Sequence, residues 1–241
     1  MKTSVVYIGQ YVLPLDLRHK HDRVYSTNPT TIDTLLADAF MCRGDRVLDA
    51  GANIGFTALH YICRGASEVH AIEPAPEVFF RLNSLEADNL FTHNIAFSDF
   101  NGSTEIFLSR SHNQGHTLNP GFLKLFPSVF GEDTERATVE VATLDRYFPS
   151  EHFDYWKVDI EGSESKFLAG AEAHLKFRPP RVVQIELYPA EYDAAAGILS
   201  RFYSTGLRAV HNPNNDQLLL LDPCSPELSA YANQAPVYIF Y

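Results

Sequence analysis

Cysteine and long apolar runs are both scarce in this 241-residue chain. The three cysteines, Cys42, Cys63 and Cys224, are odd in number and form no Cys-x-x-Cys pair, which argues against a disulfide framework or a zinc site. We expect free, mostly buried thiols in a reducing compartment. No stretch approaches the roughly 18 consecutive apolar residues of a membrane-spanning helix, and the first residues lack a signal-peptide core. The sequence therefore predicts a soluble, cytoplasmic protein without a membrane span.

Positive charge is also in short supply, because 19 Lys and Arg stand against 30 Asp and Glu, for a formal net charge of −11. An acidic surface repels phosphate backbones, so nucleic acid is a poor partner. Hydrophobic residues make up 45% of the chain, which is enough for a sizeable core and argues against disorder. Since repeats and Pro/Gly-rich linkers are absent from the sequence, we expect a single domain over residues 1–241.

Apolar strand patterns alternate with helical patterns from residue 46 onward. We expect strands at 46–50, 68–72, 92–97, 103–108, 137–144, 154–160, 181–187, 207–210, 217–221 and 237–241. We expect helices at 54–64, 75–87, 164–177 and 190–205, and an earlier helix over 32–40 capped by Thr30. Residues 1–30 are expected to form a short β extension. This alternation predicts an α/β fold with a parallel sheet, in which ligands bind at the carboxyl ends of the strands.

The turn after the first of these strands carries the motif DAGANIG at residues 49–55. Gly51 permits a tight turn and close backbone approach, and Gly55 lets the next helix pack close to the sheet. A dinucleotide would require G-x-G-x-x-G here, but Asn53 and Phe56 occupy the second and third glycine positions. Asp49 at the strand end would oppose a pyrophosphate, whereas it suits the ammonium group of an amino-acid-bearing cofactor. The loop therefore favours S-adenosylmethionine (SAM) over NAD.

A second carboxylate follows one βαβ step later. Glu73 lies 24 residues after Asp49 and ends the strand before Pro74. A carboxylate at this place can accept hydrogen bonds from both hydroxyls of a ribose. SAM and NAD both carry that ribose, so Glu73 supports a nucleoside-containing cofactor without distinguishing between them.

The pattern as a whole resembles the FkbM-type methyltransferase family. The segments that carry the likeness, from about Arg46 to Tyr188, are VLDAGANIGFTAL, AIEP, NIAFSDFNG, TLDRYF, KVDIEGSESKFLAGA and QIELYP. The loop motif is shared by many SAM enzymes, whereas the K-V-D-I-E-G-x-E run at 157–164 is much more specific. Residues 1–30 and the last fifty residues carry little family signal.

The resemblance implies a Rossmann-like class I SAM-methyltransferase fold. Its sheet would be mostly parallel and seven-stranded, with helices on both faces and an antiparallel final strand. The residues that the resemblance places against SAM are Asp49, Gly51, Asn53, Gly55 and Glu73, with Ala96, Ser98 and Asp99 near the adenine. It also implies methyl transfer, most often to oxygen, with sugar or polyketide hydroxyls as typical acceptors.

Methyl transfer to an aliphatic hydroxyl is an in-line displacement, and so weak a nucleophile benefits from a general base. Lys157, Asp159 and Glu161 alternate on and just after an expected strand, and a buried strand rarely carries three charges on one face. We therefore take Asp159 and Glu161 as candidate catalytic residues, with Asp159 also near the cofactor and Lys157 holding their charge. The alternative is that Glu161 and Gly162 merely begin the next helix as an acidic first turn.

The polar stretch 111–116 contains two further candidates, because His112 and His116 titrate near neutrality and suit proton removal. The alternative is an exposed loop whose histidines have no role. Glu186, at the end of the 181–187 strand, also faces the expected cleft unless it serves as an ion-pair partner. We expect His60 to be a surface or packing residue. The aromatic residues that either line an acceptor pocket or belong to the core are Trp156, Tyr188 and Tyr192.

Three functions remain open on these grounds. The first is an O-methyltransferase that acts on a hydroxyl of a sugar or secondary metabolite, with a small-molecule or glycan acceptor. The second is an NAD-linked oxidoreductase on a related fold, against which Asp49 and the missing third glycine argue. The third is a non-catalytic SAM-fold module that binds a partner or glycan. No histidine spacing favours a metal site, although the sequence leaves open whether a divalent metal ion takes part, and it also leaves the oligomeric state open.

Overall fold

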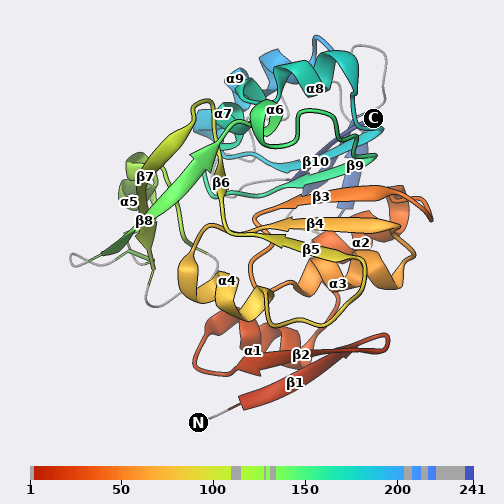
Figure 1. The fold of residues 1–241 in the computed structure, drawn as a ribbon, viewed down its shortest axis with the longest axis vertical. Helices are drawn as coiled ribbons and strands as arrows, with labels where there is room; N and C mark the ends of the chain where they lie inside the picture. Colours follow the sequence, from red (N-terminus) through yellow and green to blue (C-terminus); the bar gives the residue numbers. More distant parts are fainter. Residues whose placement is uncertain are drawn as a thin grey trace.

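The computed structural model describes residues 3–109, 115–127, 129–130, 134–203, 208–212, 217–220 and 237–241. Its main sheet has the strand order β12-β11-β13-β10-β9-β3-β4-β5 (Figure 1). The strands are β3 (Arg46–Ala50), β4 (Glu68–Ile72), β5 (Leu90–His93), β9 (Tyr155–Val158), β10 (Val182–Glu186), β11 (Arg208–Asn212), β12 (Gln217–Leu220) and β13 (Val237–Phe240). Strands β10, β9, β3, β4 and β5 run parallel. The parallel α/β sheet is as predicted.

The far edge of the sheet is antiparallel. Strand β13 runs against both β10 and β11, as predicted for the final strand. Strand β12 pairs antiparallel with β11 and adds an eighth strand. The expected count of seven is therefore wrong for the described sheet, because the 217–220 segment joins its edge.

The order of the strands reverses next to β3. The chain enters the sheet at β3, adds β4 and β5 on one side, and then places β9 and β10 on the other. The connections therefore diverge between the carboxyl ends of β3 and β9, which leaves a crevice where ligands bind in open α/β sheets.

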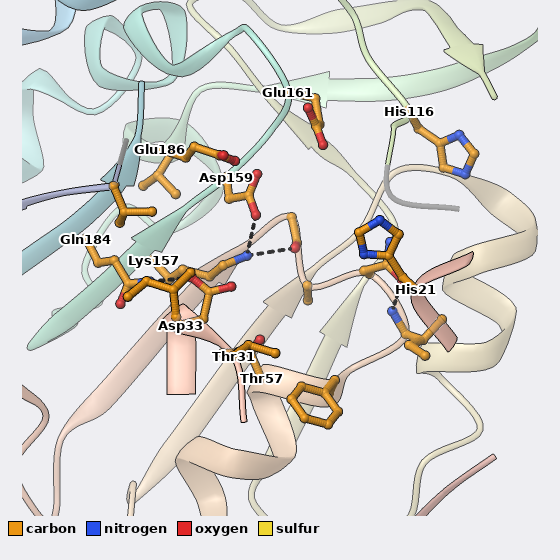
Figure 2. Close-up of a pocket in the computed structure, with 18 of the residues that line it drawn as sticks. His21, Thr31, Asp33, Thr57, His116, Lys157, Asp159, Glu161, Gln184 and Glu186 are labelled. Carbon is orange, nitrogen blue, oxygen red and sulfur yellow. Dashed lines mark hydrogen bonds and ion pairs between the residues drawn. The ribbon is translucent and has the colours of Figure 1, made fainter. Parts of the chain in front are cut away.

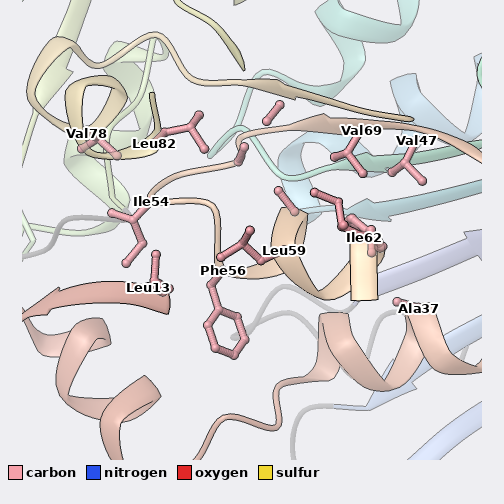
Figure 3. Close-up of a cluster of buried hydrophobic side chains, with 14 of the residues drawn as sticks. Leu13, Ala37, Val47, Ile54, Phe56, Leu59, Ile62, Val69, Val78 and Leu82 are labelled. Atoms are coloured by element: carbon pink, nitrogen blue, oxygen red, sulfur yellow. The ribbon is translucent and has the colours of Figure 1, made fainter. Parts of the chain in front are cut away.

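Helices cover both faces of the sheet (Figure 1). One face packs against α2 (Ile32–Phe40), α3 (Phe56–Cys63) and α4 (Pro76–Leu82), and the other against α6 (Leu144–Tyr147), α7 (Glu164–Ala169), α8 (Glu172–Phe177) and α9 (Pro189–Leu199). Successive strand residues face opposite clusters, so Val47 packs beside Leu59 and Val69 in Figure 3 while Leu48 faces the other core. Burial on both sides explains the continuous apolar runs of these strands.

The N-terminal segment forms a hairpin and then a helix, so the expectation of a purely β extension over residues 1–30 is wrong. Strands β1 (Thr3–Ile8) and β2 (Tyr11–Asp16) pair antiparallel, and α1 (Lys20–Thr27) follows. A tertiary contact holds this helix in place, because the buried Asp22 carboxylate accepts a hydrogen bond from Asp16 N and pairs with Arg81 of α4 at 2.5 Å. Sequence periodicity does not report such a partner.

The helix over 32–40 is present, but Thr31 rather than Thr30 caps it. Thr31 Oγ1 accepts a hydrogen bond from Thr34 N, and Thr34 Oγ1 accepts one from Thr31 N, in a reciprocal capping box. The helices expected over 54–64, 75–87 and 190–205 end earlier than predicted. Helix α9 ends at Leu199, and the helix expected over 164–177 is split into α7 and α8 at Gly170, where a Cβ would lie 2.1 Å from Ser98 O.

A small second sheet, β6-β8-β7, lies beside the main one. Its strands are β6 (Ala96–Phe97), β7 (Gly102–Leu108) and β8 (Glu135–Ala142), and helix α5 (Pro120–Leu125) lies between β7 and β8 in the chain (Figure 1). The strand expected over 92–97 is therefore wrong as one element, since its two halves belong to β5 and β6 in different sheets. Helices α5 and α6 are not predicted by the sequence patterns.

Two expectations about exposure can be compared with the structure. Cys42 and Cys63 are exposed, contrary to the expected burial, and Cys63 Sγ donates a hydrogen bond to Ile8 O at 3.1 Å. Cys224 lies outside the described residues. Among the described helices, none combines the length and hydropathy required to cross a membrane.

Candidate active site

A row of polar side chains crosses three strands on the face covered by α2 and α3. Asp49 of β3 pairs in register with Lys157 of β9, which pairs with Gln184 of β10. The preceding residue in each strand faces the opposite core, so strand alternation turns all three toward α2. Glu186 is two residues beyond Gln184 and shares its face. The row ends at the crevice where the strand order reverses.

Lys157 lies at the centre of this row and is itself buried. Its Nζ is 3.7 Å from Asp49 Oδ1. It is also 3.2 Å from Asp159 Oδ2 (Figure 2), and it donates a hydrogen bond to Gly51 O at 3.2 Å. Burial by itself would lower the pKa of Lys157, but the charges of Asp159, Asp49 and Asp33 raise it well above the usual value. Lys157 therefore stays protonated among three carboxylates.

Asp49, the acidic strand end, is completely buried beneath the loop. Burial raises the pKa of its carboxyl to about 6, and within the described part of the chain neither oxygen has a hydrogen-bond partner. The walls of the neighbouring cavity include Lys157 and Gly51 but not Asp49. The expected contact between Asp49 and an ammonium group of the cofactor thus stays a prediction. In the structure, the cation near Asp49 is Lys157.

A cavity of about 1020 Å³ opens over the carboxyl ends of β3, β4, β9 and β10 (Figure 2). The loop 51–57, helix α1, the first turn of α2 and the end of α5 complete its walls. The acidic side chains that line it are Asp33, Glu73, Asp159, Glu161 and Glu186, and the basic ones are Lys20, Lys157, His21 and His116. Ligand pockets typically measure about 300–1,000 Å³, so this cavity is at the upper end of that range. It presents groups of both signs of charge to a ligand.

The loop after β3 adopts the tight turn that its sequence predicts. Gly51, Asn53 and Gly55 all have positive φ, at 84°, 51° and 89°. Asn is among the few residues with a side chain that tolerate this region. At Gly51 a Cβ would lie 1.8 Å from Asp159 O, so the close backbone approach expected there is confirmed. The loop therefore touches the segment after β9 and brings both into one cavity wall.

Glu73 is held rigidly at the end of β4. Its Oε2 accepts a hydrogen bond from Asn53 N at 3.0 Å, and its Oε1 accepts one from Ala75 N at 2.8 Å. Burial outweighs these contacts and raises the pKa of Glu73 to about 7. Each carboxylate oxygen can accept more than one hydrogen bond. Glu73 thus presents acceptors, in a fixed orientation, to the cavity that it lines.

A narrow apolar slot of about 40 Å³ lies on the other side of the loop. Ile72, Ala96, Phe97 and Ile160 are among the residues that line it. Ala96, expected near an adenine, is therefore on its wall. Ser98 is buried and is not among the residues that line the slot, and its Oγ donates a hydrogen bond to Asp99 Oδ1 at 3.1 Å.

The segment after β9 is a sharp turn, so the expectation that residues 157, 159 and 161 share one strand face is wrong. Strand β9 ends at Val158, and Glu161 and Gly162 have φ values of 58° and 90°. A left-handed non-glycine residue such as Glu161 persists only where its surroundings hold it. The turn nevertheless brings Asp159 and Glu161 into the same cavity.

Three side chains hold this turn in place. Buried Glu164 accepts hydrogen bonds at Oε1 from Ile160 N and Gly162 N, each at 3.1 Å. From the opposite side, Thr117 Oγ1 donates to Glu161 O at 2.6 Å and Asn119 Nδ2 donates to Gly162 O at 2.7 Å. The acidic residue that closes the K-V-D-I-E-G-x-E run therefore has a structural role, since it satisfies two backbone donors of a strained turn.

The acidic groups around this turn differ in their protonation. Burial by itself would raise the pKa of Asp159, but the charge of Lys157 and a hydrogen bond with Glu186 keep it below its usual value. Burial and the neighbouring carboxylates, Asp159 first among them, raise the pKa of both Glu161 and Glu186 well above normal. Tyr188 OH donates a hydrogen bond to Glu161 Oε2 at 3.2 Å. Asp159 is thus the ionised member of this group.

His116 lines the cavity, but one of its nitrogens is engaged. Ser109 N donates a hydrogen bond to His116 Nδ1 at 3.1 Å. A neutral imidazole that accepts at Nδ1 carries its proton at Nε2. The contact therefore suits His116 as a donor to an acceptor oxygen better than as a base. His112 lies outside the described residues.

The remaining predicted residues divide between cavity, core and surface. Tyr188 lines the cavity, whereas Trp156 is buried in the core on the other face of the sheet. The rings of Tyr192 and Tyr238 are in tilted contact, with centroids 5.3 Å apart. His60 lies 2.9 Å from Asp38 and is not among the residues that line the cavity, as expected of a surface or packing residue. Within the described ranges, no cluster of three or more His, Cys, Asp or Glu side chains is arranged to hold a metal ion.

Sequence reasoning missed the N-terminal wall and one residue of the polar row. Lys20, His21 and Asp33 line the cavity from α1 and the first turn of α2. Their sequence context resembles that of exposed helix residues, so it carries no signal of this role. Gln184 did carry a signal in the sequence, because an amide inside the apolar run RVVQIEL requires a buried hydrogen-bond partner.

Comparison with known proteins identifies the family. A model of the methyltransferase FkbM domain matches residues 49–213, more than half of the chain. The chain belongs to the FkbM methyltransferase family. Its structure is similar to that of a methyltransferase FkbM from Methylobacillus flagellatus, with a TM-score of 0.55 and 17% identity. The match covers 91% of this chain and 50% of the other, so this chain spans about half the length of that relative.

Two more distant structures are similar to this FkbM family chain. The precorrin-6y C5,15-methyltransferase from Geobacter metallireducens has a TM-score of 0.47 and 8% identity, over 89% of this chain and 90% of the other. A TehB-like SAM-dependent methyltransferase from Corynebacterium glutamicum has a TM-score of 0.48 and 13% identity, over 92% and 94%. No curated protein matches the sequence. The fold is the α/β fold of class I SAM methyltransferases, with a mixed sheet.

The family match divides the cavity into two parts. The loop, Glu73, the turn after β9 and Glu186 lie within residues 49–213, whereas the wall built by α1 and α2 precedes the match. The part of the cavity at the strand ends therefore lies within the family match, and the N-terminal segment of this FkbM family chain supplies side chains from outside it.

Proposed function

We propose that this protein uses SAM to methylate a hydroxyl group of a small-molecule or glycan acceptor, such as a sugar or a secondary metabolite. Membership of the FkbM family supports methyl transfer. The observation that carries the cofactor is Glu73, which lies at the end of the second parallel strand, is clamped by two backbone N–H groups and lines the cavity, as a partner of a ribose diol would. The loop beside it has Asn53 and Phe56 where a dinucleotide-binding loop would have its second and third glycines, which favours SAM over NAD.

The chain's own residues fit SAM in three places. Glu73 would accept hydrogen bonds from the ribose hydroxyls, and the apolar slot beside Ala96 suits one edge of the adenine. Gly51, Asn53 and Gly55 would line the middle of the cofactor with backbone. The buried oxygens of Asp49, which lack hydrogen-bond partners among the described residues, add negative potential beneath the loop.

When bound, SAM supplies an electrophilic methyl group attached to a sulfonium, so the protein's contribution is alignment and proton removal. Asp159 is the residue that we assign as general base, since it is ionised and lines the cavity beyond the loop. Lys157 keeps it charged, and the hydrogen bond with Glu186 orients its carboxylate. Glu161 and His116 lie farther along the wall (Figure 2) and would bind other hydroxyls of the acceptor.

A hydroxyl-bearing acceptor is supported by the composition of this outer wall. Glu161, Glu186 and Tyr188 offer hydrogen-bonding groups along the cavity wall, and Phe126 next to Tyr188 offers an apolar face. Carboxyl groups that exchange hydrogen bonds with hydroxyls, together with an aromatic surface, form a site for a sugar-like ring.

Thermal unfolding with added ligands tests the cofactor. A ligand that binds the folded state at 100 times its dissociation constant adds about 2.7 kcal/mol, which raises the melting temperature by a few degrees. We expect SAM and S-adenosylhomocysteine to produce this rise, and NAD and NADP to leave the temperature unchanged. Glu73→Ala should weaken binding by roughly 1.5–3 kcal/mol. A rise with NAD would establish the oxidoreductase alternative, and no rise with any ligand would establish a non-catalytic module.

Asp159→Asn tests the assignment of the base. We expect transfer of a labelled methyl group to fall by about 100-fold or more, which is the usual contribution of a general base. S-adenosylhomocysteine affinity should change far less, because the amide keeps the size of the side chain. The measurement is radiolabel transfer from methyl-tritiated SAM to a panel of sugars and polyketides, with His116→Gln in parallel. Full activity of the Asp159 variant on an accepted substrate would exclude that residue as the base.

A further inference from the structure

We propose that Asp33, which precedes the family match, binds the ammonium group at the amino-acid end of the cofactor. This inference rests on the proposed use of SAM and assigns a contact within that site. Asp33 belongs to the first turn of α2 and lines the cavity beside Lys157 and Gln184 (Figure 2). Nothing in the 49–213 family match covers it.

The position of Asp33 is set by a buried chain of hydrogen bonds. Gln184 Nε2 donates to Asp33 Oδ1 at 2.6 Å, and Gln184 Oε1 accepts from the hydroxyl of Tyr155. Gln184 and Tyr155 are both almost completely buried in the sheet. Their side chains therefore hold Asp33 in one orientation above the polar row. The donor, Gln184, is neutral, so this contact brings no positive charge to Asp33.

The geometry of the cavity places the amino-acid end of the cofactor near this residue. Glu73 and the slot beside Ala96 mark the adenosyl end, on the β4 side of the loop. A ligand that follows the loop from there extends toward β9 and β10, where Lys157, Gln184 and Asp33 line the wall. This direction brings a zwitterionic amino acid to a place with both signs of charge.

The charges at that place favour a cationic group of a ligand. The charges of Asp159, Asp49 and Asp33 all raise the pKa of Lys157, and Asp159 also accepts a hydrogen bond from it. Asp49 is buried behind the cavity wall. Asp33 lines the cavity beside Gln184, where it would face the ammonium group of a ligand.

Calorimetric binding of three ligands to the full chain tests the assignment. S-adenosylhomocysteine carries ammonium and carboxylate, decarboxylated SAM keeps the ammonium, and 5′-methylthioadenosine lacks both. We expect Asp33→Asn to weaken the binding of S-adenosylhomocysteine and of decarboxylated SAM about ten- to hundredfold, the scale of a lost charge-assisted hydrogen bond. The affinity for 5′-methylthioadenosine should stay within about twofold of the wild type.

Asp38→Asn is the matched control, because Asp38 lies on the same helix but pairs with Arg64 at 2.8 Å on the exposed side. We expect it to bind all three ligands as the wild type does. If Asp33→Asn lowered the affinity for all three ligands equally, or lowered none of the affinities, the inference would be overturned while the cofactor assignment stayed intact. A wild-type chain that binds none of the three would overturn the proposed function, and this inference with it.

Discussion

Gly51→Ala should abolish cofactor binding and destabilise the protein severely. A methyl group at this position would lie 1.8 Å from the backbone oxygen of Asp159, and the residue has a φ of 84°. Backbone cannot rotate away as a side chain can, so the loop or the turn after β9 must move. Clashes of this kind, added to a strained φ, place the change among the few that cost more than about 4 kcal/mol. The measurement is urea unfolding together with binding of S-adenosylhomocysteine.

Gly44→Ala provides a control that separates the clash from the strain. Gly44 has a comparable φ of 94°, but a Cβ at this position would have no heavy atom within 4 Å. We expect Gly44→Ala to reduce the free energy of unfolding only by the cost of placing alanine in the left-handed region, about 1–2 kcal/mol. It should also bind S-adenosylhomocysteine normally. If both glycine variants lost the same stability, the contact between the loop and Asp159 would not be the cause.

The free energy of unfolding should fall as the pH rises from 6.5 to 8. Glu164 has a usual pKa of 4.5 and a folded-state pKa of about 8, and Glu73 has one of about 7, in both cases chiefly because of burial. In this range the folded chain holds protons that the unfolded chain has released, so stability decreases with pH. A group that is protonated in the folded chain and ionised in the unfolded chain changes the free energy of unfolding by about 1.4 kcal/mol per pH unit. For Glu164 this amounts to roughly 2 kcal/mol between pH 6.5 and 8.

The choice of pH range matters because buried histidines act in the opposite direction. Burial lowers the pKa of His93 from 6.5 to about 4, so its contribution to stability rises with pH between those values and ends near 6.5. Urea unfolding at half-unit steps above pH 6.5 therefore reports the carboxyl groups. Glu164→Gln, which retains the acceptor for Ile160 N and Gly162 N, should reduce the slope. The exposed Glu105→Gln is the control, and a Glu164 variant with the wild-type slope would contradict the expectation.

The parts of the fold that could be predicted from the sequence are those with local physical causes. The DAGANIG loop contains glycines where the chain needs positive φ, and the structure has these values at Gly51 and Gly55. The alternating apolar runs located β3, β4, β9 and β10, because strands buried on both faces have few other compositions. Glu73 was found for the same reason, since the end of a parallel strand is a place that pattern and spacing define.

The errors have a common cause, which is contact between segments distant in the sequence. Helix α1 depends on the pair between Asp22 and Arg81, and the 92–97 run divides because its second half pairs with β8 instead of β4. The turn after β9 depends on Thr117 and Asn119, which donate to it from another sheet's connection. Sequence periodicity carries no information about these distant partners. The predicted strand over 154–160 therefore continued past Val158, where β9 ends.

What the sequence by itself determined about this protein is the core of the family's machinery: a parallel sheet, a glycine-bearing loop, Glu73 and the acidic run from Asp159. Tertiary structure decided which charges face one another. Lys157 meets Asp49 and Asp159, and Gln184 holds Asp33, because strand register aligns the row and α2 packs across it. Backbone conformation follows from neighbouring residues, whereas the ionisation and direction of a buried group follow from whatever the fold places beside it.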